Sequence, residues 1–196
     1  MLYQIHRYPA DLIDTVGLPD GQRVVVRPVL PQDEALTDAY FRDLRAASRY
    51  DRFLGPMRTL PAGLVAHLTH IDYSSHLALV AEVFVDGRET VIAEARYARG
   101  EDKTSAEFAV SVADAWQGKG LARLLLGKIG RHAANAGVRR FHGETLASNE
   151  RLLRLARRAG FAVRPSPDVP GLMLLEKVLR AAEAEPENSH AALPAA

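Results

Sequence analysis

The 196-residue sequence contains no cysteine. This absence excludes a disulfide framework, a covalent thiol nucleophile and thiolate metal sites, and it favours a reducing cytoplasm as the compartment. The sequence also lacks any run near the roughly 20 apolar residues that cross a membrane, and its start lacks the pattern of a signal peptide. We therefore expect a cytoplasmic protein without a membrane partner.

A strong excess of either charge is also missing, since 25 Lys and Arg residues face 24 Asp and Glu residues. Nothing in this balance attracts nucleic acid or an acidic partner. The lone Trp116 is more typical of packing than of base stacking. The seven histidines show no pair at the spacing of metal ligands on one helix. The sequence therefore predicts neither a nucleic-acid partner nor a metal.

The length and the 47% share of hydrophobic residues suit one well-buried domain. We assign it to residues 22–180. Residues 1–21 form an N-terminal extension whose role the sequence does not show. Residues 181–196 are rich in alanine, glutamate and proline and are predicted to be a disordered tail. The pattern leaves the oligomeric state open, and a homodimer is one possibility.

The order of hydrophobic patterns predicts a mixed α and β domain. A first strand is followed by two helices that flank a basic and aromatic loop at 48–53. Three strands then form an antiparallel meander, and helix alternates with strand after it. The expected strands are 23–27, 77–85, 90–97, 105–112, 139–146, a segment from 161 onward and 172–179, and the expected helices are 31–46, 61–70, 120–136 and 149–159.

The most informative stretch is the turn between strand 105–112 and the helix after it. Gly118 and Gly120 lack side chains, so the main chain here can approach a ligand closely. The following helix begins with unpaired N–H groups and positive partial charge, which together suit a pyrophosphate. The alternative is that the two glycines only make a tight connection between strand and helix.

The pattern Gln117-x-x-Gly120-x-Ala122 resembles the acyl-CoA signature of the GNAT acetyltransferase superfamily. Two further blocks agree with it, around Arg27-Pro28 and from Asn149 to Gly160-Phe161. The resemblance covers about residues 23–179. More narrowly, the segments 48–53 and 71–73 are similar to the catalytic domain of bacterial Pat-type protein lysine acetyltransferases. We expect no fused module.

This resemblance implies an α/β (α+β) GNAT fold, with a mixed, mostly antiparallel seven-stranded sheet that is splayed at its centre and flanked by about four helices. Acetyl-CoA would bind at the split as cosubstrate. Its pantetheine arm would pair with the main chain at Val110 and Val112. Asn149 would either touch the arm or only cap its helix. The pyrophosphate would bind the turn formed by Gln117, Gly118, Lys119, Gly120, Leu121 and Ala122.

The acceptor chemistry calls for a base, because a lysine amine with a pKa near ~10.4 is neutral in only about one molecule in ~2500 at pH 7. Glu107 is our candidate, since it shares a strand face with two small residues and matches a glutamate base of some family members. It could instead be a solvated or salt-bridged strand residue. Glu94 and Glu144 are weaker rivals, and the N–H of Val112 is the expected oxyanion donor.

A general acid is missing, because Leu155 and Ala156 occupy the places where this family commonly has a tyrosine. The predicted activity is acetyl transfer from acetyl-CoA to a primary amine, with a protein lysine as the favoured acceptor. A small-amine acetyltransferase, a non-catalytic acyl-CoA-binding or sensing module and a scaffold protein are the alternatives. The sequence does not name the acceptor or the preferred acyl chain.

Overall fold

The computed structural model describes residues 8–180, so the predicted tail at 181–196 lies outside the described residues, as do residues 1–7. The described residues form one sheet with the strand order β1-β2-β3-β4-β5-β6-β8-β7. Neighbouring strands are antiparallel except for the parallel pair β5 and β6. The strands are β1 (Asp14–Gly17), β2 (Arg23–Pro28), β3 (His76–Val85), β4 (Arg88–Arg99), β5 (Ser105–Val112), β6 (Arg140–Leu146), β7 (Ala162–Pro165) and β8 (Leu172–Val178).

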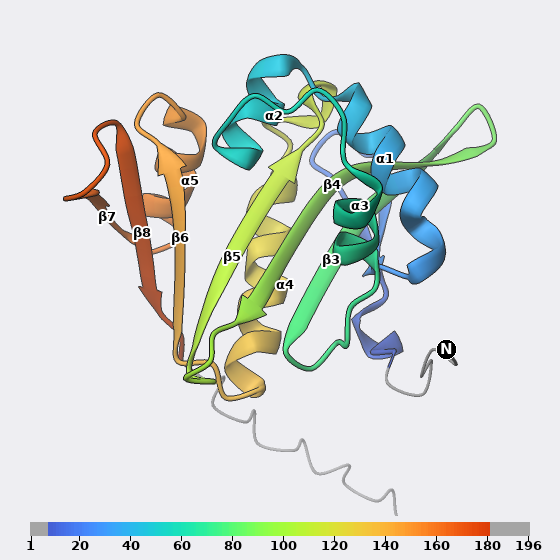
Figure 1. Cartoon of the computed structure of the whole chain (residues 1–196). Coiled ribbons are helices and arrows are strands. Elements are labelled where there is room, and N and C mark those ends of the chain that lie inside the picture. The colour runs from blue at the N-terminus through green and yellow to red at the C-terminus, as the bar shows by residue number, and fades with distance from the viewer. Residues whose placement is uncertain (1–7, 181–196) are drawn as a thin grey trace, which may run out of the picture.

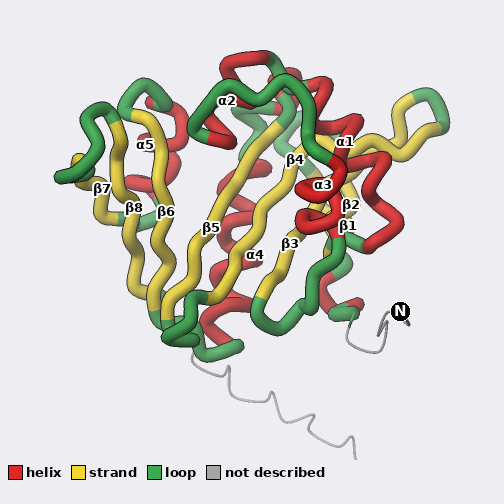
Figure 2. Tube along the Cα trace, viewed as in Figure 1, coloured by secondary structure: helices red, strands yellow, loops and turns green. Residues whose placement is uncertain are grey.

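Within residues 8–180, five α-helices flank this sheet on its two faces (Figure 1). The tube view shows α1, α2 and α3 on the near side and α4 behind the strands (Figure 2). Side chains of α4 and α5 join one apolar cluster with the far face of the sheet. The helices are α1 (Glu34–Asp43), α2 (Ala46–Phe53), α3 (Ala62–Thr69), α4 (Leu121–Asn135) and α5 (Glu150–Arg158).

Within residues 8–180, the structure has one strand more than the seven expected and one helix more than the four expected. The additional strand is β1, which lies inside the predicted N-terminal extension and pairs with β2. Its four residues are too few to show an alternating pattern. The additional helix is α2, at the place of the predicted loop 48–53. None of the residues of α2 is buried, so the apolar spacing that reveals a helix is absent.

Helix α4 packs on the sheet as its sequence predicts. Its apolar side chains recur at helical spacing, and Leu121, Leu125, Ile129 and Ala133 are each at most 1% exposed. Burial of a leucine or isoleucine side chain stabilises a fold by about 1.5–3 kcal/mol. The start of α4, directly after the glycine turn, is therefore firmly positioned against the sheet.

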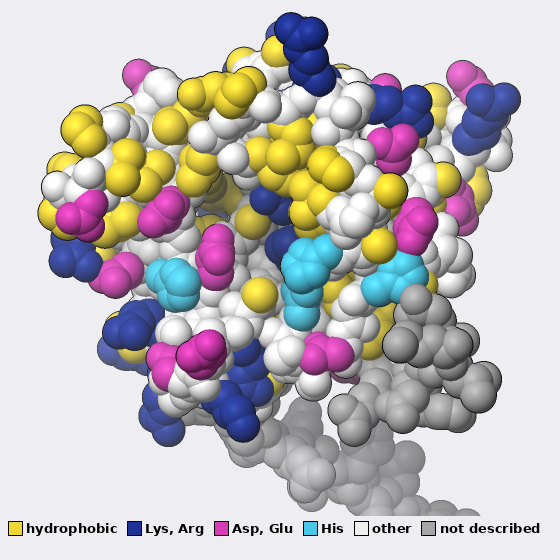
Figure 3. Space-filling view, viewed as in Figure 1, with side chains coloured by type: hydrophobic (Ala, Val, Ile, Leu, Met, Phe, Trp, Pro, Cys, Tyr) yellow, Lys and Arg dark blue, Asp and Glu magenta, His cyan; other side chains and the backbone are white. Residues whose placement is uncertain are grey.

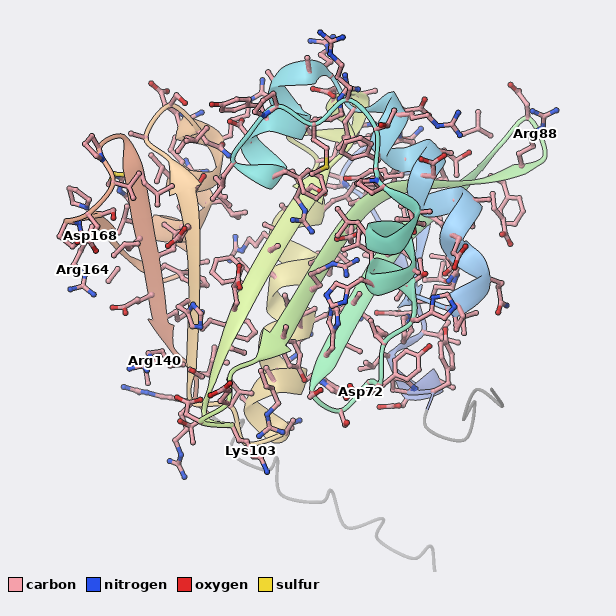
Figure 4. All side chains as sticks on the ribbon, in the orientation of Figure 1. Asp72, Arg88, Lys103, Arg140, Arg164 and Asp168 are labelled. Carbon is pink, nitrogen blue, oxygen red and sulfur yellow. The ribbon has the colours of Figure 1, made fainter. Side chains whose placement is uncertain are left out.

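The sheet is split at its centre between β5 and β6. These strands pair only where residues 105–107 lie beside residues 140–142. Beyond that point β5 continues along β4, and β6 continues along β8. Figure 1 shows the two strands diverging, and Arg140 in Figure 4 marks the end at which they are still joined. The expected splayed centre is thus present.

The vertex of this split is formed by a phenylalanine ring lying against a glycine. A Cβ atom added to Gly143 would lie 2.9 Å from Cε1 of Phe108 and 3.2 Å from its carbonyl oxygen. The Phe108 ring cannot move freely, because it stacks on the Phe141 ring at 5.7 Å and lies tilted against the Phe161 ring at 4.8 Å. Only glycine leaves room for this contact.

Gly143→Ala is therefore expected to lower the free energy of unfolding by about 1–3 kcal/mol, the usual cost of overpacking a core. Urea denaturation would measure this change. Gly63→Ala is the matched control, because no atom lies within 4 Å of a Cβ there and alanine favours the helix. An equal effect of both substitutions would show that the vertex is not tightly packed.

Candidate active site

The main chain of β5 presents hydrogen-bonding groups to the split. Ala113 donates its N–H to the carbonyl of Ile92 on β4 at 2.8 Å. Main-chain groups alternate between the two sides of a strand, so those of the even-numbered residues in β5 face away from β4. The N–H and C=O groups of Val110 and Val112 therefore point into the split, where the sequence analysis expects the pantetheine arm.

The turn after β5 has the conformation of an anion-binding loop. Gly118 and Gly120 have φ angles of +82° and +88°, in the left-handed region that favours glycine. An added Cβ would meet nothing within 4 Å at either position, so this side of the turn is open. Helix α4 begins at Leu121 without a side-chain cap. The amides of Leu121 and Ala122 have no intrahelical acceptor and are free to bind an anion.

Gln117 joins the turn to the split. Its side-chain nitrogen Nε2 donates to the carbonyl of Val112 at 3.1 Å. Its Oε1 atom is buried and has no hydrogen-bond partner in the described part of the chain. A buried acceptor without a donor costs free energy, so a ligand N–H or O–H group beside it would be favourable. The open glycine turn and this unpaired oxygen both fit a molecule of acyl-CoA.

The side chain of Lys119 points to the N-terminal residues rather than lying free. Its Nζ atom is 2.6 Å from Oδ2 of Asp20 and 2.9 Å from Oε1 of Gln22. The ammonium also lies 4.6 Å from the centre of the Trp116 ring. The ammonium group of Lys119 is therefore paired with the turn before β2. The main chain of Lys119 is the part of this residue that faces a ligand of the glycine turn.

Asn149 caps helix α5, because its Oδ1 atom accepts a hydrogen bond of 3.1 Å from the N–H of Leu152. This is one of the two roles that the sequence allowed, and a contact with the CoA arm stays a prediction. Leu155 and Ala156, which stand where a tyrosine would be a general acid, are within the same helix.

Glu107 lies on the near face of the sheet with an exposed side chain. In the register of the sheet it stands between Ala98 on β4 and His142 on β6. Its carboxylate forms no ion pair within residues 8–180. A carboxylate that is exposed and uncommitted, beside the vertex of the split, is available to accept a proton.

Glu94 has the opposite environment. Its side chain is buried, and its Oε1 atom lies 2.8 Å from Nε of Arg96 and 3.1 Å from Nη2 of Arg52. Burial acts to raise the pKa of Glu94, but the two guanidinium groups outweigh it and hold the pKa at about 2. This carboxylate is therefore a structural anion, whereas the other rival, Glu144, is exposed on β6. Figure 3 shows the near face of the molecule, where Lys or Arg atoms line the floor of a hollow.

The sequence analysis did not identify Tyr40, which lines the same small cavity as Glu94. The hydroxyls of Tyr40 and Ser111 are 2.8 Å apart, next to a cavity of about 10 Å³ that has room for about one water molecule. Burial raises the pKa of Tyr40 above its usual value, and the hydrogen bond to Ser111 lowers it only in part. Tyr40 is thus a weak proton donor. No local pattern could reveal this pair, which is 71 residues apart.

Within residues 8–180, no three His, Asp or Glu side chains are grouped so that they could hold a metal ion. No helix in the same range has the length and apolar character to cross a membrane.

A split sheet whose free strand edge leads into a glycine turn and a helix N-terminus defines a class of acyl-CoA-binding enzyme. Residues 38–161 match the Acetyltransferase (GNAT) family, so the chain belongs to that family. It is an acyl-CoA-dependent N-acetyltransferase that uses acetyl-CoA. The predicted enzyme class and fold class are thereby confirmed.

Three individual relatives are similar to this chain over most of its length. Acetyltransferase PA5475 of Pseudomonas aeruginosa is 32% identical over 152 residues, which are 78% of this chain and 82% of that protein. Acetyltransferase Pat of Mycolicibacterium smegmatis is 33% identical over 146 residues, 74% of this chain but only 43% of Pat. The crystal structure of the GNAT domain of S. lividans PAT superposes with a TM-score of 0.80 at 32% identity, covering 88% of this chain and all of that one.

Proposed function

We propose that this acetyltransferase transfers the acetyl group of acetyl-CoA to the side-chain amine of a lysine in a protein. Residues 22–180 would form the catalytic domain, with β1 adding an edge strand. The observation that carries the proposal is the exposed Glu107 carboxylate beside the split, with no ion-pair partner in the described residues. It is a base for an ammonium that arrives from solvent.

The donor would be held mainly by main-chain groups. Val110 and Val112 would pair with the pantetheine arm, and Asn149 would approach it from α5. The amides at Gln117, Gly118, Lys119, Gly120, Leu121 and Ala122 would bind the pyrophosphate, favoured by the positive end of α4. Acetyl-CoA supplies the activated thioester carbonyl when it is bound.

In the proposed reaction the amine attacks directly within a complex of both substrates. Glu107 accepts a proton from the ammonium, directly or through one water molecule, because only the neutral amine is a nucleophile. The N–H of Val112 donates a hydrogen bond to the carbonyl oxygen as charge develops there. The C–S bond breaks as the C–N bond forms, and the second proton of the amine passes to the departing thiolate or to water. We assign no general acid from the protein, since a thiol with a pKa near ~8.5 can leave as the thiolate.

The shape of the molecule favours a protein acceptor over a small amine. Small-molecule sites are usually concave pockets of about 300–1,000 Å³ that enclose their ligand. On the face that carries Glu107, the cavity beside Glu94 and Ser111 measures only about 10 Å³, and Glu107 itself is exposed. A larger space of about 480 Å³ lies on the α4 side of the sheet, lined by Leu126, Phe141 and Phe161 among others. An open face suits a lysine that projects from a larger surface, and the similarity to Pat and to the PAT domain points the same way.

The proposal is tested by incubating the protein with acetyl-CoA and a cell lysate, then mapping acetylated lysines and small amines by mass spectrometry. Acetylated protein lysines that depend on added enzyme are the expected result. Acetylation confined to small amines would assign the enzyme to that alternative. No transfer to any amine would overturn the proposed function.

Gly120→Val is expected to raise the Kd for acetyl-CoA about 10- to 100-fold. A β-branched residue at a φ of +88° is strained by about 1–3 kcal/mol, so the turn would leave its binding conformation. Isothermal titration calorimetry would measure the change. Gly87→Val is the matched control, because Gly87 has a φ of +74° at the tip of the β3–β4 hairpin, beside Arg88 and away from the split (Figure 4). Equal Kd values for the two variants would contradict the proposed cofactor turn.

A further inference from the structure

The hollow of about 480 Å³ on the α4 side of the sheet lies apart from the cofactor turn. Its walls come from the second half of α4, from Phe141 on β6 and from the end of β8. Phe141 pairs with Ala106 on β5, so the hollow is at the end of the sheet where β5 and β6 are still joined. Gly130, in its wall, follows the first residue of α4 by nine positions, which is roughly 14 Å along the helix axis. The hollow is therefore separate from the open end of the split.

Two glycines inside α4 leave the hollow open. Gly127 and Gly130 both line it, and a glycine destabilises the interior of a helix relative to alanine. A Cβ atom at Gly130 would lie 3.8 Å from Cε2 of Phe141, and one at Gly127 would lie 3.8 Å from Nη1 of Arg131. Both are ordinary contact distances, so close packing does not require a glycine at either position. The two glycines keep free a space that side chains could have filled.

The floor of the hollow is apolar, aromatic and rigid. Leu126, Phe141 and Phe161 line it, and all three are buried. The two rings also lie against Phe108, the ring at the vertex of the split. The volume of the hollow is within the range of small-molecule sites, which is about 300–1,000 Å³. The floor is thus formed before any ligand arrives.

The charged groups around the hollow are all cationic. They are Arg131 on α4, Lys177 on β8 and Arg180 just beyond that strand. No Asp or Glu of residues 8–180 lines the hollow, and none of the three cations forms an ion pair within that range. The ammonium of Lys177 lies 5.6 Å from the centre of the Phe161 ring, directly beside the aromatic floor. Charge complementarity therefore favours an occupant with an apolar body and a negatively charged head.

We propose that this hollow is a binding site for a medium-chain fatty carboxylate. The alkyl chain lies on the rings of Phe141 and Phe161, in the space that the α4 glycines leave, and its burial supplies affinity. The carboxylate head faces Arg131 and Lys177, because a guanidinium can bind a carboxylate through two parallel hydrogen bonds. The site is separate from the catalytic split, so the inference does not depend on the identity of the acceptor.

Isothermal titration calorimetry of the full chain with octanoate tests this site. One saturable site per chain is expected. Acetate and 1-octanol each lack one half of the ligand and should bind at least ~10-fold more weakly. Gly130→Leu should abolish binding, because the new side chain fills the hollow. Arg131→Gln combined with Lys177→Gln should raise the Kd about 10- to 100-fold and weaken its dependence on salt.

Gly63→Leu and Arg88→Gln are the matched controls and should keep the wild-type Kd. Gly63 is in α3, on the opposite side of the sheet, and no atom lies within 4 Å of a Cβ there. Arg88 is at the tip of the β3–β4 hairpin (Figure 4). A wild type without saturable binding would overturn the proposal, and so would a Gly130→Leu variant that binds octanoate as the wild type does.

Two further outcomes would assign the hollow to a different occupant and so contradict the proposal. Octanoate binding that appears only in a chain ending at Arg180 would show that the protein's own C-terminal residues occupy the hollow. A sedimentation coefficient that falls from that of a dimer to that of a monomer in Gly130→Leu would show that a second copy of the chain occupies it. A wild type that binds octanoate with an unchanged sedimentation coefficient supports the fatty carboxylate.

Discussion

Replacing Glu107 by glutamine is expected to lower kcat for lysine acetylation about 100- to 1,000-fold, while the Kd for acetyl-CoA stays the same. The variant keeps the shape of the side chain but cannot accept a proton. Loss of a positioned base typically costs about 10²–10⁴ in rate. Steady-state kinetics with a lysine acceptor would measure kcat, and calorimetry would measure donor binding separately.

The pH dependence sharpens this prediction. The fraction of neutral amine rises with pH toward the lysine pKa of ~10.4, so the need for a base falls. The deficit of Glu107→Gln should therefore shrink as the pH rises. Glu144→Gln, at an exposed carboxylate on β6, is the control and should retain activity. A large loss in Glu144→Gln with full activity in Glu107→Gln would exchange the two roles.

Replacing Glu94 by glutamine is expected to reduce the free energy of unfolding by about 3–5 kcal/mol. Removing one partner of a buried ion pair leaves the remaining charge uncompensated, and this is the usual cost. Here two guanidinium groups, Arg52 and Arg96, would lose their shared carboxylate, with side chains only 14% and 9% exposed. Urea denaturation at neutral pH would measure the loss. Glu150→Gln is the control, because its pair with Arg154 is exposed and should change stability by less than about 1 kcal/mol.

The same carboxylate makes stability depend on pH in a defined direction. The pKa of Glu94 is held at about 2 in the folded protein, against an ordinary value of 4.5. Because the folded pKa is depressed, the stabilisation is fully present above about pH 4.5 and is lost as the pH falls toward 2. Glu94→Gln should lack this part of the acid-induced loss. Parallel curves for both proteins between pH 5 and 2 would contradict the assignment.

Local patterns predicted the segment from β5 to α4 well. The period of two in β5, the two glycines and the helical spacing that begins at Leu121 each depend on residues a few positions apart. The structure confirms the strand, the left-handed glycines and the buried helix face. The predicted contacts with acetyl-CoA stay predictions.

The parts that the sequence did not predict depend on contacts between distant residues. Helix α2 is capped by Asp114, 66 residues beyond Ser48, so its own segment resembles a loop. Glu94 looked like a possible base because the sequence does not show that Arg52 and Arg96 converge on it. Strand β1 exists because β2 offers it a ladder of hydrogen bonds. Each of these features requires the fold before it can be recognised.

The split between β5 and β6 has a consequence for the behaviour of the protein in solution. Two strands in the middle of the sheet carry free edges, and a free edge is a template on which another chain can add a strand. In the proposed binding mode, acetyl-CoA would cover one of these edges by pairing with β5. The enzyme without its donor is therefore expected to self-associate more readily than the complex with acetyl-CoA.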